Sequence, residues 1–145
     1  VLAAYFVLWF DYYHDYNQRT AYFTPEILPD NAADKTMAAL IYDYEFRGQP
    51  INIHLPDYYI VWKLGVTPIS VIDYRFGAIG RKVGEDVLPK YSPWAGRTRR
   101  YDGRYDKMDY LLIGGRLPEE LASRLSLFRQ IKTKGNWFLY ENQSR

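Results

Sequence analysis

Apolar positions change their spacing along the chain, and each change predicts a different element. Residues 1–10 carry no charge, and aromatic residues then recur every three or four positions as far as Tyr16. This spacing is that of one helical face, so it predicts a helix from the start of the chain to about residue 23. The charge-free run is about half as long as a bilayer span requires.

Two interpretations of this helix fit the sequence. It is either a buried core helix or the distal end of a transmembrane helix whose earlier turns lie outside this sequence. Trp9, Tyr13 and Tyr16 cluster where apolar residues give way to polar ones, and such rings settle at the headgroup level of a membrane. We therefore expect residues 1–23 to form an amphipathic segment of their own, followed by one domain over residues 24–145.

Three short apolar runs in that domain predict strands. Residues 36–42 and 108–113 are almost continuously apolar, which is typical of strands buried on both faces. Residues 66–72 are rich in β-branched side chains and predict another strand. Residues 128–132 and 136–140 predict a closing hairpin, joined by the three residues Thr133, Lys134 and Gly135.

Helical spacing separates these strands. A short helix is expected after Thr24, with Pro25 at its first position and an end before Pro29. Residues 55–64 show a helical pattern that stops at Gly65. Residues 118–127 predict a further helix, whose apolar face is formed by Leu121, Leu125 and Phe128.

This alternation predicts an α/β fold. We expect a Rossmann-like layered sheet of about five strands, with flanking helices and a C-terminal antiparallel hairpin at its edge. Residues 73–107 are rich in glycine and proline and follow no period, so they predict a long irregular loop.

Composition narrows the classes of function. The chain has 145 residues, enough for one core, and 18% of them are aromatic, including 15 tyrosines. Its net charge is only +2 and its charges are interleaved, which disfavours a nucleic-acid partner. It has no cysteine, so disulfides, thiolate nucleophiles and cysteine-bound zinc are excluded. We expect no cofactor.

Two motifs resemble catalytic or phosphate sites without completing one. Gly114 and Gly115 follow a strand and precede a helix, where phosphate can bind, but Glu119 and Glu120 in the next turn would repel it. His54 stands before a predicted helix start, where capping competes with a metal or acid–base role. No histidine has a second one at metal-ligand spacing, so neither a catalytic nor a metal site is predicted.

The segment around Trp94 is the best candidate for ligand contact. It interleaves aromatic rings with the guanidinium groups of Arg97, Arg99 and Arg100. Such a mixture can stack on sugar rings and clamp phosphates or carboxylates, or meet anionic lipid headgroups. A solvated loop is the alternative interpretation.

Several motifs together resemble the C-terminal region of large bacterial multi-spanning membrane proteins similar to glycosyltransferases of the GT-C type. They are the pair Leu28 and Pro29, the strand 38–43, the segment 46–50, His54 with Tyr58 and Tyr59, the run 108–115 and the run 135–140. The likeness covers residues 23–141. Its motifs have moderate specificity, because strand cores in general contain similar runs.

The resemblance implies a soluble, non-catalytic domain after the last membrane span, tethered through its N-terminus on the extracytoplasmic face of the bacterial inner membrane. Its partners would be a glycan or a lipid-phosphate-linked sugar and the membrane portion of its own parent chain. The role would be acceptor binding or packing against that portion. The alternative is a self-standing domain that binds a ligand or another protein. The candidate ligand contacts are His54, Tyr58, Tyr59, Trp94, Arg97, Arg99 and Arg100.

Overall fold

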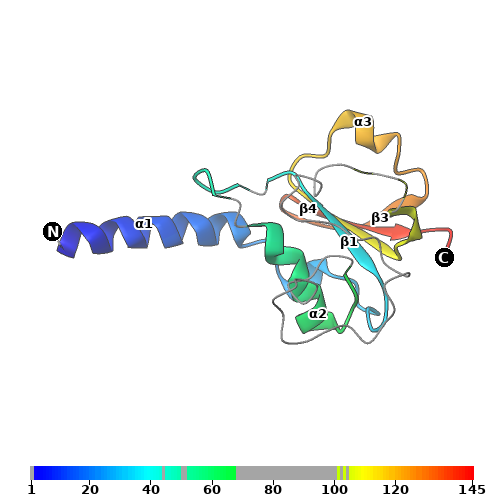
Figure 1. Cartoon of the computed structure of the whole chain (residues 1–145), viewed down its shortest axis with the longest axis horizontal. Helices are drawn as coiled ribbons and strands as arrows, with labels where there is room; N and C mark the ends of the chain where they lie inside the picture. Colours follow the sequence, from blue (N-terminus) through cyan, green and yellow to red (C-terminus); the bar gives the residue numbers. More distant parts are fainter. Residues whose placement is uncertain (1, 44, 50–51, 68–100, 102, 104) are drawn as a thin grey trace, which may run out of the picture.

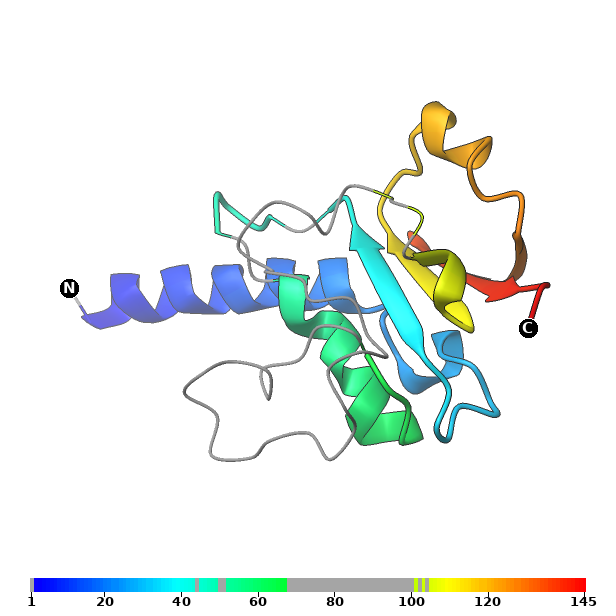
Figure 2. The same cartoon turned by 45° about the vertical axis from the view of Figure 1, so that its right-hand side comes forward.

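The computed structural model describes residues 2–43, 45–49, 52–67, 101, 103 and 105–145 (Figure 1). Within these residues a mixed sheet lies between two layers of helices and turns, and one long helix projects away from the sheet (Figures 1 and 2). The expected α/β class is confirmed. The described part of the sheet has four strands, not about five.

The strands β1 (Met37–Ile41), β2 (Tyr110–Gly114), β3 (Phe128–Lys134) and β4 (Trp137–Asn142) lie in the order β1-β2-β4-β3. β1 and β2 are parallel, whereas β4 runs antiparallel to both β2 and β3. All four occupy runs that the sequence predicted as strands. The hairpin folds back so that β4 lies inside the sheet and β3 forms the edge.

Of the expected strand at residues 66–72, only Val66 and Thr67 lie among the described residues. Val66 forms an isolated parallel bridge with Thr36, in which the Met37 amide donates to the Val66 carbonyl at 2.8 Å. Residues 68–72 lie outside the described residues. The expectation of about five strands therefore gives way to four, because pairing beside β1 is limited to this bridge in the described chain.

Both faces of β1 and β2 are covered, which explains their continuous apolar runs. Side chains alternate between the faces, so neighbouring residues of one strand enter different clusters. One face packs on Ile27, Leu28 and Tyr59. The other packs on Met108 and Leu121 and on the further residues Tyr101, Tyr105, Leu125 and Phe128.

The turn between β3 and β4 is one residue shorter than the sequence suggested. Strand β3 continues to Lys134, so only Gly135 and Asn136 connect the two strands. Gly135 has a φ of 58°, and a β-carbon there would approach the Tyr22 ring to 2.4 Å. Glycine is required at this position both by the left-handed backbone and by this close contact.

The long helix α1 (Leu2–Thr20) ends three residues earlier than expected. After it, the 3-10 helix η1 (Pro25–Ile27) begins at the predicted Thr24 and Pro25. The predicted helix at residues 55–64 is divided between the 3-10 helix η2 (Asn52–Asp57) and the helix α2 (Tyr58–Lys63).

The helix α3 (Glu119–Ala122) is much shorter than the predicted residues 118–127. Leu121, Leu125 and Phe128 are nevertheless buried, as their spacing predicted, because a turn beyond α3 keeps them on the sheet. Before β2, the 3-10 helix η6 (Tyr105–Lys107) packs Tyr105 against the same face. Most of the expected loop at residues 73–107 lies outside the described residues.

Candidate functional site

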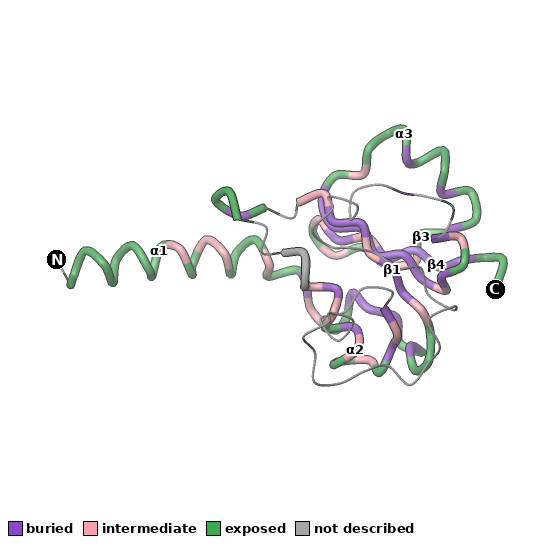
Figure 3. The backbone as a smooth tube through the Cα atoms, viewed as in Figure 1, coloured by how far each residue is buried: buried purple, intermediate pink, exposed green. Residues whose placement is uncertain are grey.

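The first half of α1 exposes apolar side chains on all sides. Figure 3 shows this half of the helix standing clear of the rest of the fold, with every residue exposed. The exposed fraction is 66% for Phe6, 67% for Leu8 and 74% for Phe10. No residue of α1 is buried. A helix that is apolar all round normally lies in a protein core or in a membrane, and here the core does not cover it.

The second half of α1 is attached to the domain through Phe46, which is fully buried. Its ring centroid lies 4.8 Å from that of Tyr12 and 5.6 Å from that of Tyr16, both edge-on. The Arg19 guanidinium lies 5.3 Å from the Phe46 ring centroid, within the range of a cation–π contact. These contacts hold the polar half of the helix on the turn of residues 45–49.

Arg47 completes this attachment. Its guanidinium donates to the Asp11 carboxylate at 2.8 Å and to that of Asp15 at 3.4 Å, and lies over the Tyr12 ring. The hydrogen bond to Asp11, with the charges of both carboxylates, raises the pKa of Arg47. We call Phe46 and Arg47 the α1 clamp. A shallow hollow of about 430 Å³ between Arg47 and α1 is lined mainly by Tyr5, Leu8, Trp9 and Tyr12.

A second cluster of aromatic rings lies where α2 meets the end of the N-terminal segment. Trp62 packs against Tyr58 with ring centroids 4.6 Å apart, and Phe23 lies 5.6 Å from Trp62. Phe23 is buried and contacts Trp137 beneath it, whereas Tyr58 is 45% and Trp62 36% exposed. Together these rings form an aromatic platform on which Tyr58 and Trp62 are partly exposed.

The structure separates two neighbouring candidates, Tyr58 and Tyr59. Tyr58 belongs to the exposed platform. Tyr59 is fully buried, and its hydroxyl donates to the carbonyl oxygens of Ala32 and Lys35, each at 3.3 Å. Burial raises the pKa of Tyr59, so this hydroxyl stays protonated as a donor. Tyr59 therefore supports the loop before β1 from the core and does not offer its ring to a ligand.

The other sequence candidates are placed less fully. His54 lies in η2, and its side chain is outside the described residues. Trp94, Arg97, Arg99 and Arg100 all lie outside the described residues as well. Of the candidates, only Tyr58 is thus placed on a described surface. Trp62 is the residue that the sequence motifs did not single out, although it follows Tyr58 by one helical turn and so shares its face.

The turn after β2 behaves as a structural turn. Gly115 has a φ of 90°, and its amide donates to the Asn136 carbonyl at 2.8 Å, so this donor is already used. A β-carbon on Gly115 would meet the Asp43 backbone nitrogen at 2.8 Å. Glu119 and Glu120 form the first turn of the short helix α3. The occupied amide and the acidic first turn of α3 both disfavour a phosphate here, in agreement with the sequence argument from Glu119 and Glu120.

The described residues show neither a metal centre nor a bilayer span. They contain no group of three His, Asp or Glu side chains placed to hold a metal ion. None of the helices among them combines the length and the apolar character needed to cross a bilayer. No protein-family model, curated protein or solved structure matches the chain, so the geometry above and the sequence motifs carry the functional conclusion.

Proposed function

We propose that this chain is a non-catalytic domain of a membrane-bound glycosyltransferase-like protein, tethered through α1 at the extracytoplasmic face of a bacterial inner membrane. It would aid acceptor or glycan binding there, or pack against the membrane part of the same protein. The observation that carries the membrane part of this proposal is the exposure of the apolar half of α1 on all sides.

Water is a poor environment for this half-helix. Leu2, Phe6, Val7, Leu8 and Phe10 are each between 66% and 75% exposed. Burying one such side chain is worth about 1.5–3 kcal/mol, so a surface of this size would favour transfer to an apolar medium. Neighbouring exposed apolar side chains of this kind mark interaction or membrane surfaces.

The order of side chains along α1 agrees with an entry into a bilayer. Charge begins only at Asp11, and from there the helix is held on the domain by the α1 clamp. Tyr5, Trp9 and Tyr13 lie around this change, and their rings contact one another in sequence. Tyrosine and tryptophan prefer the boundary between hydrocarbon and headgroups, which would place the domain just outside the bilayer.

A protein partner explains the same helix less well. A helix bound in a groove presents one apolar stripe and keeps a polar face toward water. Residues 2–10 of α1 have no polar face, since their polar side-chain groups are limited to the hydroxyl of Tyr5 and the indole N–H of Trp9. The all-round apolar surface favours lipid, or several surrounding membrane helices, over a single groove.

Vesicle flotation tests the membrane tether. The purified chain should float with phospholipid vesicles, and the double variant Phe6→Glu, Leu8→Glu should stay in the dense fraction. The matched control is Leu127→Glu, a charge introduced at another exposed leucine, far from α1 in the sequence, which should float normally. A wild-type chain that fails to float, or a double variant that still floats, would contradict the tether.

The glycosyltransferase-like parent is supported by the sequence motifs and needs its own test. The gene should be sequenced upstream of the codon for Val1. The proposal expects one reading frame that continues through several apolar segments of about 20 residues each. A start codon or a signal peptide immediately before Val1 would exclude this parent and favour the self-standing domain.

A further inference from the structure

We propose that the hollow between the loop of residues 30–35 and the end of α2 binds a neutral sugar ring stacked on Trp62. The hollow measures about 470 Å³, within the range of small-molecule sites. Its chemistry comes from Asp30, Asn31, Lys35, Trp62 and Lys63. The inference rests on the proposed function for its biological meaning. It adds the surface that would contact the glycan.

The two walls of the hollow are joined to each other. The Asp34 amide donates to the Leu64 carbonyl at 3.3 Å, and the Val66 amide donates to the Lys35 carbonyl at 2.8 Å. Asp34 and Leu64 have left-handed backbones, with φ of 61° and 55°. The hydrogen bonds across the walls hold these turns in place, so the recess is formed by the fold itself.

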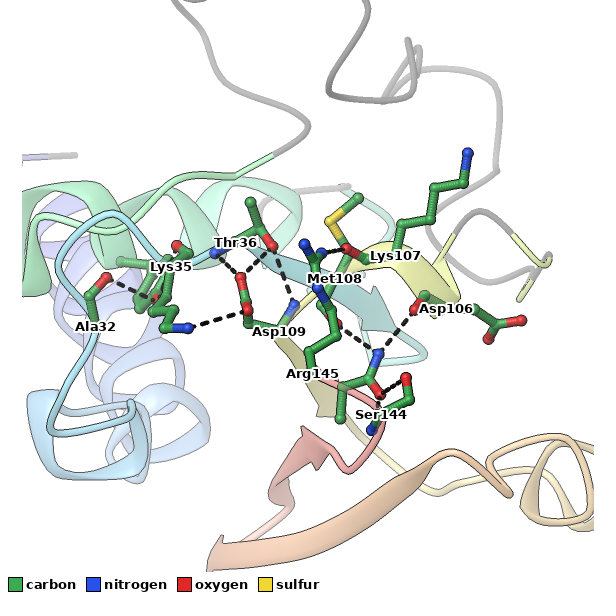
Figure 4. A network of polar contacts seen from close by, with 11 residues as sticks. Ala32, Lys35, Thr36, Asp106, Lys107, Met108, Asp109, Ser144 and Arg145 are labelled. Carbon is green, nitrogen blue, oxygen red and sulfur yellow. Dashed lines mark hydrogen bonds and ion pairs between the residues drawn. The ribbon is translucent and has the colours of Figure 1, made fainter.

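The loop wall is also fixed from the core. The buried Tyr59 hydroxyl donates to the carbonyl oxygens of Ala32 and Lys35. Figure 4 shows Ala32, Lys35 and Thr36 beside Asp109, which accepts from both the amide and the hydroxyl of Thr36. The side chains at the rim are therefore carried by a backbone that would not need to reorganise on binding, which lowers the cost of association.

Trp62 supplies the apolar part of the site. Trp62 is 36% exposed, and its ring packs against Tyr58 and Phe23. One face of a pyranose ring carries mainly C–H bonds, which pack on an aromatic face, while its hydroxyl groups point outward around the rim. The exposed part of the indole, beside polar side chains, matches that division.

The polar side chains suit hydroxyl groups better than an anion. Lys35 lies 3.4 Å from Asp109, and Lys63 lies 3.9 Å from Asp30, so each lysine has a carboxylate partner. Asp30 also pairs with Lys132 at 3.0 Å, and this hydrogen bond, with the Lys132 charge, lowers the pKa of Asp30. Each of these three lysines already contacts one of the two carboxylates. Such paired donors and acceptors can bond a neutral polyol, whereas a phosphate is bound best by cations without a carboxylate partner.

Saturation-transfer NMR on the purified chain tests this site. The probes are glucose, galactose, mannose and N-acetylglucosamine, each added alone, with inorganic phosphate as the anionic probe. We expect saturation transfer to the ring protons of at least one sugar. Added phosphate should not displace that sugar. Trp62→Ala should weaken the affinity about tenfold, the effect of losing one stacked ring.

Two further variants, Asp30→Ala and Asn31→Ala, test the site if Trp62→Ala does not fold. Both side chains are exposed, so their removal should leave the fold intact. Each should weaken sugar binding with an unchanged circular dichroism spectrum. The matched control is Val61→Ala, which changes an exposed neighbour of Trp62 outside the hollow and should bind as the wild type. Three outcomes would overturn the inference: no saturation transfer to any sugar, binding unaffected by all three substitutions, or competition by phosphate.

The result is independent of the membrane test. If the chain binds a sugar but does not float, the membrane tether is contradicted and the sugar site is supported. If the chain floats but binds no sugar, the sugar site is contradicted and the membrane tether is supported.

Discussion

Asp109 and Thr36 bind each other across the entrance to the two parallel strands. The Asp109 carboxylate accepts from the Thr36 amide at 2.8 Å and from its hydroxyl at 2.7 Å, while the Asp109 amide donates to the Thr36 hydroxyl oxygen at 3.0 Å (Figure 4). The pair joins residues 73 positions apart in the sequence. It sets the register of β1 against β2, which begins one residue later at Met37 and Tyr110.

Replacing Asp109 with alanine should destabilise the fold. The substitution leaves the amide and the hydroxyl of Thr36 without their acceptor, which costs about 1–3 kcal/mol in the free energy of unfolding. Asp109→Asn keeps an acceptor oxygen and should cost less. Urea unfolding monitored by circular dichroism measures both. Glu120→Gln, which changes an exposed acidic residue on α3, serves as the control. If the control lost as much free energy of unfolding as Asp109→Ala, the role of Asp109 would be contradicted.

The same pair predicts how stability depends on acid. Partial burial raises the pKa of Asp109, but hydrogen bonds from Thr36 and the charges of Lys35 and Arg145 outweigh it and hold the pKa below its ordinary value. A lowered folded-state pKa gives stability that is present above the unfolded value and is lost as pH falls through the folded value. As pH falls below the usual aspartate range, the free energy of unfolding should therefore decline less steeply in Asp109→Asn than in the wild type. Urea unfolding at a series of acidic pH values measures both slopes, and equal slopes would contradict the prediction.

A label on α1 should report where the membrane begins. The chain has no cysteine, so one introduced cysteine can carry an environment-sensitive fluorophore. At position 7, in place of Val7, the emission should shift to the blue when vesicles are added. At position 18, in place of Gln18 in the polar half, it should not shift. Equal shifts at both positions would place the whole helix on the membrane surface instead.

The α1 clamp should control the helix and not the sheet. Phe46→Ala removes the ring contacts with Tyr12 and Tyr16. The polar half of α1 would then be held on this turn by the exposed ion pairs of Arg47 with Asp11 and Asp15, and exposed ion pairs contribute little in water. Hydrogen exchange of the amides of residues 12–19 should accelerate by about tenfold or more. The amides of β2 should be unchanged. Gln49→Ala, on the same turn, is the control, and uniform acceleration throughout the chain would contradict a local effect.

Two glycines separate backbone strain from steric conflict. Gly48 has a φ of 78° and would place a β-carbon in open space, with nothing within 4 Å of it. Gly115 has a φ of 90° and would place its β-carbon 2.8 Å from a backbone nitrogen. Gly48→Ala should cost about 1–2 kcal/mol, the strain alone. Gly115→Ala should cost clearly more, because strain and overlap combine. Thermal unfolding of both variants checks the order, and equal losses would show that the contact relaxes.

The sequence alone determined most of the secondary structure. Its strongest patterns reflect whether side chains are buried, and this requirement does not depend on where in the fold the element lies. The runs at residues 36–42 and 108–113 became β1 and β2, buried on both faces, and the spacing of Leu121, Leu125 and Phe128 identified three core residues. Thr24 and Pro25 marked the start of η1. The sequence did not set the lengths of α3 and of the hairpin, where packing decides between a helix and a turn.

Only the tertiary structure decided which distant residues meet. Phe46 and Arg47 carry no periodic signal, and their contacts with α1 depend on how the turn of residues 45–49 folds back. The hollow beside Trp62 lies between the polar loop before β1 and the end of α2. In the sequence these two segments look like a linker and a helix terminus, and nothing there indicates that they meet. Adjacent positions also diverged, since the short helix α2 turns Tyr58 outward and Tyr59 into the core. Local patterns record whether a residue is buried, whereas a site requires the relative placement of elements, and long-range contacts such as the Asp109–Thr36 pair fix that placement.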